Sequence, residues 1–222
     1  MDTYILHLET ATKVCSVALS KNGKLIGLKE TEEEGYSHGE NLNCFIEDVI
    51  QKEGISLNQL SAISLASGPG SYTGLRIGAA TAKGLCYALE IPLIAIDALL
   101  ALTEIAREVY PDKVLCPLID ARRMEVYNSF FDENNHLIKE ISADIIDENS
   151  YTQFEPFVFF GDGAEKLVEV WNNKNCVADL SIKSSAQGQV KLAFEKFKAQ
   201  AFEDVAYWEP FYLKDFIAGV KK

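Results

Sequence analysis

Residues 66–89 read ASGPGSYTGLRIGAATAKGLCYAL, and the interpretation of the whole chain depends on this stretch. A tight turn of Gly68, Pro69 and Gly70 is followed by Ser71, which is a good N-cap residue and predicts the start of a helix. The helix is expected over residues 71–89, before Pro92. Glycines at 74, 78 and 84 lie inside it, and each lowers helix stability by about 1 kcal/mol relative to alanine. Glycines inside this helix therefore require an explanation, which is either a bound phosphate or a neighbouring backbone that packs closely against the helix.

A nucleotide-binding loop is the first candidate reason. The P-loop pattern GxxxxGK[ST] is absent, because Leu75 and Arg76 follow Gly74 where Lys and Ser or Thr are required. The pattern GxGxxG fails too, since position 73 is threonine. The turn is therefore interpreted as a cap, while an anion site at the helix N-terminus stays an open alternative.

Close packing is the second candidate reason. Gly74, Gly78 and Ala82 are four residues apart, so they share one face of the predicted helix. Such a stripe of small residues, here called the small-residue seam, allows another backbone to approach closely. The neighbour is either another part of this chain, such as its first helix, or a second protein, and the spacing alone does not decide.

The pattern along the chain predicts an α/β fold in two halves. Strands are expected at 3–9, 14–20 and 24–31, then a helix at 37–53, a strand at 61–67, the helix at 71–89, a strand at 92–97 and a helix at 98–110. The second half begins with another three-strand meander at 114–120, 124–132 and 136–143. A strand, turn and helix follow over 157–171, and a further helix over 184–200. The repeated opening suggests duplication, with lobes at 1–100 and 101–222.

Composition excludes several classes of protein. The chain has 222 residues, and its 33 acidic residues against 21 basic ones give a net charge of −12, which disfavours binding of nucleic acid by this chain alone. Five cysteines occur without a CxxC pair, which is typical of a reduced protein. Because no apolar run reaches the roughly 20 residues of a membrane span, and no signal peptide is apparent, the protein is expected in the cytoplasm without a membrane partner.

Catalytic motifs are sparse. His38 begins a predicted helix, but position 42, where a second metal ligand would follow, is leucine, and no HExxH motif occurs. A GxSxG elbow is absent around Ser71. Glu9, Asp97 and Asp120 follow apolar strands, where carboxylates either line a cleft or cap a turn. We expect no metal site and no cofactor.

Several motifs together carry a family resemblance. The stretch SGPGSYTGLRIGAATAKGLCYAL closely resembles the signature of the TsaB (YeaZ) family of bacterial tRNA threonylcarbamoyladenosine biosynthesis proteins. Supporting matches cover most of the chain: ILHLETATKVCSVAL (5–19), SHGENLNCFI (37–46), IDARRMEVYNSFF (119–131), GDGA (161–164) and EPFYLKD (209–215).

The resemblance implies a fold and a role. The fold is the two-lobe actin-like ATPase or sugar-kinase (ribonuclease H-like) fold, with a mixed sheet of βββαβα order in each lobe. The role is that of a non-catalytic subunit, which binds and activates the transferase TsaD for N6-threonylcarbamoyladenosine formation at position 37 of tRNAs that read codons beginning with A. The ATPase TsaE joins the pair, tRNA is reached only through the complex, and a homodimer is possible in isolation.

The resemblance also assigns residues. In TsaD an HxxxH pair holds the metal, whereas this chain has His38 and Leu42. The phosphate turn, usually Asp-x-Gly, is Glu9-Thr10-Ala11 here, so Glu9, Gly68, Pro69, Gly70 and Ser71 form at most a vestigial anion or nucleotide site. Helices 37–53 and 71–89 correspond to the family's pairing face. The predicted partner-binding residues are His38, Asn41, Leu42, Phe45, Ser71, Tyr72, Thr73, Gly74, Leu75, Ile77, Gly78, Thr81, Ala82 and Leu85.

Two other functions stay open at this point. One is an actin-like kinase or ATPase acting on its own in the cleft between the lobes, against which the missing phosphate-turn glycine counts. The other is a metallopeptidase, against which the missing second histidine counts.

Overall fold

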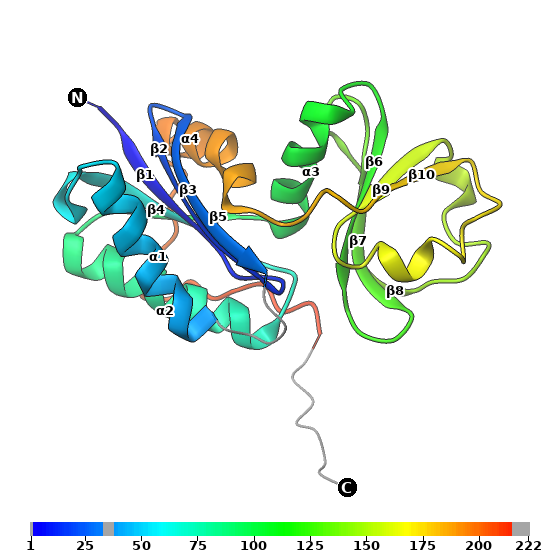
Figure 1. The fold of residues 1–222 in the computed structure, drawn as a ribbon, viewed down its shortest axis with the longest axis horizontal. Coiled ribbons are helices and arrows are strands. Elements are labelled where there is room, and N and C mark those ends of the chain that lie inside the picture. Colours follow the sequence, from blue (N-terminus) through cyan, green and yellow to red (C-terminus); the bar gives the residue numbers. More distant parts are fainter. Residues whose placement is uncertain (1, 33–37, 215–222) are drawn as a thin grey trace, which may run out of the picture.

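A computed structural model describes residues 2–32 and 38–214 (Figure 1). The first lobe is built on a five-stranded sheet of order β3-β2-β1-β4-β5. Its strands are β1 (Tyr4–Glu9), β2 (Val14–Lys21), β3 (Lys24–Glu32), β4 (Leu60–Ala66) and β5 (Leu93–Ile96). The first three are antiparallel neighbours, and β4 and β5 continue the sheet in parallel with β1. The predicted meander followed by two parallel strands is therefore confirmed.

Two helices cover one face of this sheet. They are α1 (His38–Lys52) and α2 (Tyr72–Leu89), which lie side by side in Figure 1. Alternation along β1 places Leu6 and Leu8 in the core beneath them. The Ser71 hydroxyl caps α2 by accepting a hydrogen bond from the Gly74 amide at 3.2 Å. Both helices match their predictions within a residue; Ser37, the expected first residue of α1, lies outside the described residues.

The second lobe repeats the first. Its sheet has the order β10-β9-β6-β7-β8, with antiparallel pairs β6–β7 and β7–β8 and parallel pairs β6–β9 and β9–β10. The strands are β6 (Val114–Asp120), β7 (Glu125–Phe131), β8 (Leu137–Ile145), β9 (Phe157–Phe160) and β10 (Cys176–Asp179). Each sheet thus places its meander and its two parallel strands in the same order, as expected for a duplicated unit.

The chain then returns to the first lobe. Helix α3 (Ala98–Val109) packs against β6, and the 3₁₀ helix Ala186–Gln189 and helix α4 (Val190–Lys198) lie against the first sheet. Ala193 of α4 shares an apolar cluster with Ile5 and Ile94, on the sheet face opposite α1 and α2. The expectation that all of 101–222 forms the second lobe is therefore wrong for residues 186–208, which pack on the first lobe. Lys214 forms an ion pair with Glu125 of the second lobe, and residues 215–222 are not described.

Two local predictions also differ from the structure. The helix expected after residue 160 is a short 3₁₀ helix (Glu165–Leu167) followed by turns, because Trp171 packs edge-on against the rings of Phe157 and Phe159 and this packing outweighs the local pattern. The helix expected from 184 becomes regular only at Val190. A side chain at Gly188 would lie closer than 3.0 Å to the carbonyl oxygen of Ala101, so this backbone instead sits directly on α3.

Candidate functional site

The inner face of α2 packs against the turn between β1 and β2. The Thr10 hydroxyl donates a hydrogen bond to the carbonyl oxygen of Gly74 at 2.8 Å. A Cβ atom added at Gly74 would lie closer than 3.0 Å to the Thr10 carbonyl oxygen, and one added at Gly78 would lie closer than 3.0 Å to the Thr10 hydroxyl oxygen. Only glycine therefore lets α2 approach this turn.

The small-residue seam is consequently an internal contact. Gly74 and Gly78 are buried and Ala82 is fully buried, so no partner helix can pack on them. The hypothesis that these three residues let a partner dock is wrong. The neighbour within the chain is mainly the Thr10 turn, together with His38 at the start of α1, whose Cδ2 atom lies 3.3 Å from the position of a Gly74 Cβ.

The other predicted partner-binding residues divide by exposure. Thr73 is exposed, and a second group is half-buried: Asn41, Ser71, Tyr72, Ile77, Thr81 and Leu85. A third group is buried in the first lobe: His38, Leu42, Phe45 and Leu75, besides the seam. The structure brings α1 and α2 together, but only the first two groups can contact another molecule without rearrangement.

The outward face of α2 carries a different set of small residues. Ala80, Gly84 and Ala88 are exposed at helical spacing, and Tyr87 beside them is 83% exposed. A Cβ atom added at Gly84 would meet no atom within 4 Å in the described residues. This glycine therefore has no packing reason of the kind found at Gly74 and Gly78. Sequence reasoning missed this face because Gly84 lies outside the four-residue spacing of Gly74, Gly78 and Ala82, which pointed to the inner face alone.

The Gly68–Ser71 turn is held by the protein's own backbone. The Ser71 amide donates to the carbonyl oxygen of Ala11 at 2.7 Å, and a side chain at Gly70 would collide with the same residue. Gly68 has φ +107°, and its inner side faces the carbonyl oxygen of Phe211. These contacts favour the cap-and-turn interpretation. An anion site at this turn stays a prediction.

Glu9, at the end of β1, is a buried carboxyl group beside this turn. Its Oε1 atom accepts a hydrogen bond from the Ala11 amide at 2.7 Å. Burial raises its pKa to about 7, and the nearby charge of Asp162 acts in the same direction, whereas hydrogen bonds from Ala11 and Gln189 oppose the shift. Burial therefore favours the neutral, protonated form of Glu9 more than in an exposed glutamate.

Asp162 of the second lobe lies close enough to Glu9 for its charge to act on that carboxyl group, and Asp120 is its neighbour within the second lobe. The Asp120 amide donates to Asp162 Oδ1 at 3.0 Å, and Lys166 forms an ion pair with Asp120. Asp162 is exposed, and Asp120 and Lys166 of the second lobe and Lys13 of the first lie near it. Partial loss of hydration, with the neighbouring Asp120 charge, raises its pKa, against the attraction of Lys13 and Lys166. The Oδ1 atom of Asp120 also accepts a hydrogen bond from the Arg122 amide at 3.1 Å, so Asp120 caps the turn after β6, which is one of its two predicted roles.

Asp97 takes the other role foreseen for a carboxylate after a strand. It caps α3, its Oδ1 atom accepting a hydrogen bond from the Leu100 amide at 2.8 Å. Burial raises its pKa to about 6, although the hydrogen bonds from the helix amides oppose that shift. Asp97 thus stabilises a helix start and does not join Glu9 and Asp162.

Metal binding finds no support at α1. His38 is fully buried, and its Nε2 atom lies 2.9 Å from the carbonyl oxygen of Thr12, while Leu42 is part of the apolar core. Burial lowers the pKa of His38. Across residues 2–32 and 38–214, no group of three or more His, Cys, Asp or Glu side chains is arranged to hold a metal ion. Within the same ranges, no helix is long and apolar enough to cross a membrane.

Comparison with known proteins places the chain in a family. Residues 32–218 match the family described as "TsaD: tRNA N6-adenosine threonylcarbamoyltransferase". The tRNA threonylcarbamoyladenosine biosynthesis protein TsaB of Escherichia coli is 29% identical over 227 residues, covering 98% of this chain and 97% of that protein. The Haemophilus influenzae protein of the same name is 36% identical over 125 residues, which cover 56% of this chain and 52% of that protein.

Solved structures agree with the sequence relatives. YeaZ from Pseudomonas aeruginosa superimposes with a TM-score of 0.83 at 25% identity, covering 95% of this chain and all of that one. An activator of 2-hydroxyisocaproyl-CoA dehydratase from Clostridium difficile, solved with ADPNP, has a TM-score of 0.52 at 10% identity over 90% of this chain and 97% of that one, a likeness of fold alone.

Two lobes with sheets of the same strand order, together with these structural neighbours, define a protein of the two-lobe α/β ATPase-like fold class. Within that class, the chain belongs to the TsaB (YeaZ) family. The resemblance seen in residues 67–89 and the flanking motifs is thereby confirmed.

Proposed function

We propose that this chain takes part in tRNA threonylcarbamoyladenosine biosynthesis as a non-catalytic subunit that binds and activates the transferase TsaD. TsaD would form N6-threonylcarbamoyladenosine at position 37 of tRNAs that read codons beginning with A, and the ATPase TsaE would join the pair. The tRNA would contact this chain only within the complex, in the cytoplasm. The names of the curated relatives given above are the basis for proposing this pathway.

The observation that carries the proposal is the outward face of α1 and α2, centred on Gly84. A glycine inside a helix is unfavourable by about 1 kcal/mol relative to alanine, and the described residues offer no internal contact that would require it. Ala80, Gly84 and Ala88 are exposed and carry no side-chain atom beyond Cβ, so a partner helix could lie close to the α2 backbone there. Half-buried Ile77 and Thr81 continue this surface towards the N-terminus of α2.

The substitution Gly84→Leu tests this face. Because no atom lies within 4 Å of the added Cβ, the variant should fold, and its leucine should hold a partner away. We expect its affinity for TsaD to fall at least about tenfold, as for an interface residue whose loss is worth more than 1.4 kcal/mol. Glu195→Leu is the matched control, since Glu195 is exposed on α4, on the opposite face of the same sheet.

Titration of TsaD by calorimetry, with melting curves for each variant, gives the comparison. Normal TsaD binding by folded Gly84→Leu would overturn the assignment of this face. The activating role has a separate readout, the rate of tRNA modification by TsaD with and without this chain. If TsaD modified tRNA equally fast without it, the proposed role would be wrong even if the two proteins bound.

A further inference from the structure

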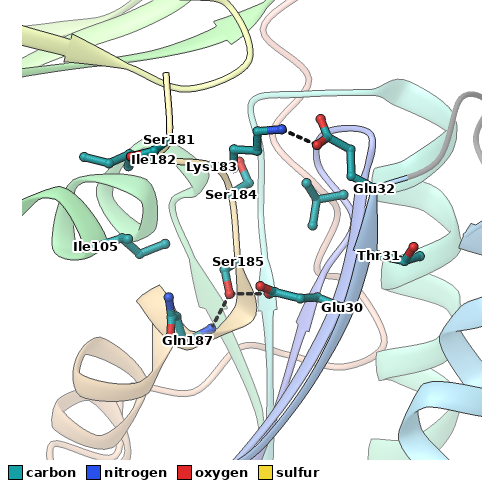
Figure 2. A pocket seen from close by; sticks show the side chains of 11 residues that line it. Glu30, Thr31, Glu32, Ile105, Ser181, Ile182, Lys183, Ser184, Ser185 and Gln187 are labelled. Carbon is teal, nitrogen blue, oxygen red and sulfur yellow. Dashed lines mark hydrogen bonds and ion pairs between the residues drawn. The ribbon is translucent and has the colours of Figure 1, made fainter. Parts of the chain in front are cut away.

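A pocket of about 340 Å³ lies between the edge of the first sheet and the segment that returns from the second lobe (Figure 2). One wall is the end of β3, with Glu30, Thr31 and Glu32, and Val14 at the start of β2. The other wall is the return segment 181–187, and Ile105 of α3 closes one side. The pocket is remote in structure from the outward face of α2, because α1 and α2 cover the opposite side of the sheet from α4.

Glu30 is the first group that points to a ligand. Its Oε2 atom accepts hydrogen bonds from the hydroxyl groups of Ser16 at 2.9 Å and Ser185 at 2.6 Å. Figure 2 shows its carboxylate directed across the pocket towards Ser185. Within the described ranges no Lys, Arg or His forms an ion pair with it, whereas the neighbouring Glu32 is paired with Lys183. Glu30 is thus held in place by two neutral donors and can accept from a cation.

Ser184 is the second and independent group. It is only 7% exposed and lines the same pocket. In the part of the chain that the structure describes, its hydroxyl makes no hydrogen bond, and yet it is not sealed from solvent. Because it lines the pocket and bonds no other group of the described chain, this hydroxyl is available to a molecule that enters the pocket.

The other residues that line the pocket indicate which class of ligand would fit it. Val14, Ile105 and Ile182 give the pocket an apolar side, and Ile182 is 5% exposed. The two carboxylates of β3 outnumber the one ammonium of Lys183, so the local charge is negative, like that of the whole chain at −12. An ammonium group has three donors and no acceptor, which suits a carboxylate and a free hydroxyl.

We propose that this pocket binds a small linear amine with primary ammonium groups at its ends, of the diamine or polyamine class. One ammonium group contacts Glu30, and the Ser184 hydroxyl, which lies beside Lys183 in Figure 2, offers the ligand a further acceptor. The methylene chain lies on Ile105 and Ile182, and the second ammonium group competes with Lys183 for Glu32. An α-amino acid fits less well, because its carboxylate would face two glutamates with only Lys183 to offset them. The ligand would join β3 of the first lobe to the return segment.

Calorimetric titration with 1,4-diaminobutane at low ionic strength tests the proposal, since screening weakens such contacts. Glu30→Gln keeps an acceptor for Ser16 and Ser185 but removes the charge, and it should weaken binding at least about tenfold, as expected for a charge-assisted hydrogen bond. Ser184→Ala should weaken binding by a smaller, several-fold factor. Glu47→Gln, an exposed position on α1, removes the same charge elsewhere and should leave the affinity unchanged.

Each result has a defined reading once melting curves show that the variants are folded. Equal losses in Glu30→Gln and Glu47→Gln would mean that the amine is attracted only by the net charge, which overturns the site. Binding of L-threonine but not of the diamine would overturn the ligand class. Because the readout needs neither TsaD nor tRNA, failure here leaves the proposed function untouched, and the reverse also holds.

Discussion

Gly78→Ala is predicted to destabilise the protein, even though alanine is the better helix former. The added Cβ would lie closer than 3.0 Å to the hydroxyl oxygen of Thr10, which is itself buried. To make room, the hydroxyl must move away from the carbonyl oxygen of Gly74, to which it donates at 2.8 Å.

The magnitude follows from three contributions. Helix propensity favours alanine by about 1 kcal/mol. Losing the buried hydrogen bond and leaving its groups unsatisfied costs about 1–3 kcal/mol, and overpacking costs about 1–3 kcal/mol more. The free energy of unfolding should therefore fall by roughly 1–5 kcal/mol, which a urea titration resolves.

Removing the Thr10 hydroxyl should abolish or reverse the loss of stability caused by Gly78→Ala. In a Thr10→Ala background the hydroxyl oxygen is gone, and the Thr10 Cβ would lie 3.6 Å from the new methyl carbon, an ordinary contact. There Gly78→Ala should be neutral or stabilise by up to about 1 kcal/mol. Gly74→Ala should not be rescued in this way, because its obstacle is the backbone oxygen of Thr10.

Gly84→Ala is the matched control, since nothing described lies within 4 Å of its added methyl group. It should stabilise the protein by about 1 kcal/mol. If Gly78→Ala stabilised the wild-type protein as much as Gly84→Ala does, the two faces of α2 would not differ as argued, and the assignment of the seam to the Thr10 turn would be refuted.

The remaining predictions concern pH, capping, catalysis and RNA. Folding raises the pKa of Glu9 to about 7, so the free energy of unfolding should fall as the pH rises from about 4.5 through 7. Glu9→Gln should therefore raise the melting temperature relative to wild type more at pH 8 than at pH 5. An equal difference at both pH values would contradict this prediction. Ser71→Ala should lower the unfolding free energy by about 1 kcal/mol in a denaturant titration. The purified protein should not hydrolyse ATP above background, and metal-dependent turnover that disappears in Glu9→Ala would oppose this prediction. A gel shift at physiological salt should show no sub-micromolar binding of tRNA by this chain alone.

Much of the fold could be predicted from the sequence because local residue patterns indicate most of its strands, helices and helix caps. The meander of β1 to β3 alternates, α1 shows helical spacing, and Ser71 and Asp97 follow the rules for helix caps. The structure of the segment after Gly161 could not be predicted from its helical spacing, because its apolar residues pack into an aromatic cluster around Trp171. The return of α4 to the first sheet is likewise a long-range contact with no local signal.

The site could be predicted only in part, for a similar reason. The spacing of Gly74 and Gly78 indicated correctly that something approaches α2 closely, but spacing cannot say whether the neighbour is Thr10 or another protein. The pocket beside Glu30 could not be foreseen, because Ser184 is 154 positions away from it in the chain and the two come together only when the lobes fold.

The return of α4 to the first sheet has a consequence for synthesis of the protein on the ribosome. Since residues 114–179 form the second sheet as a continuous piece, that lobe can close as soon as it has emerged. The first lobe is synthesised earlier, but it cannot complete its packing until α4 and Glu203, which forms an antiparallel bridge with Leu93, have been made. The half that is made first is thus finished last. In the interval the apolar side of its sheet around Ile5 and Ile94 is uncovered, which makes this nascent stage the one most exposed to aggregation and to chaperones.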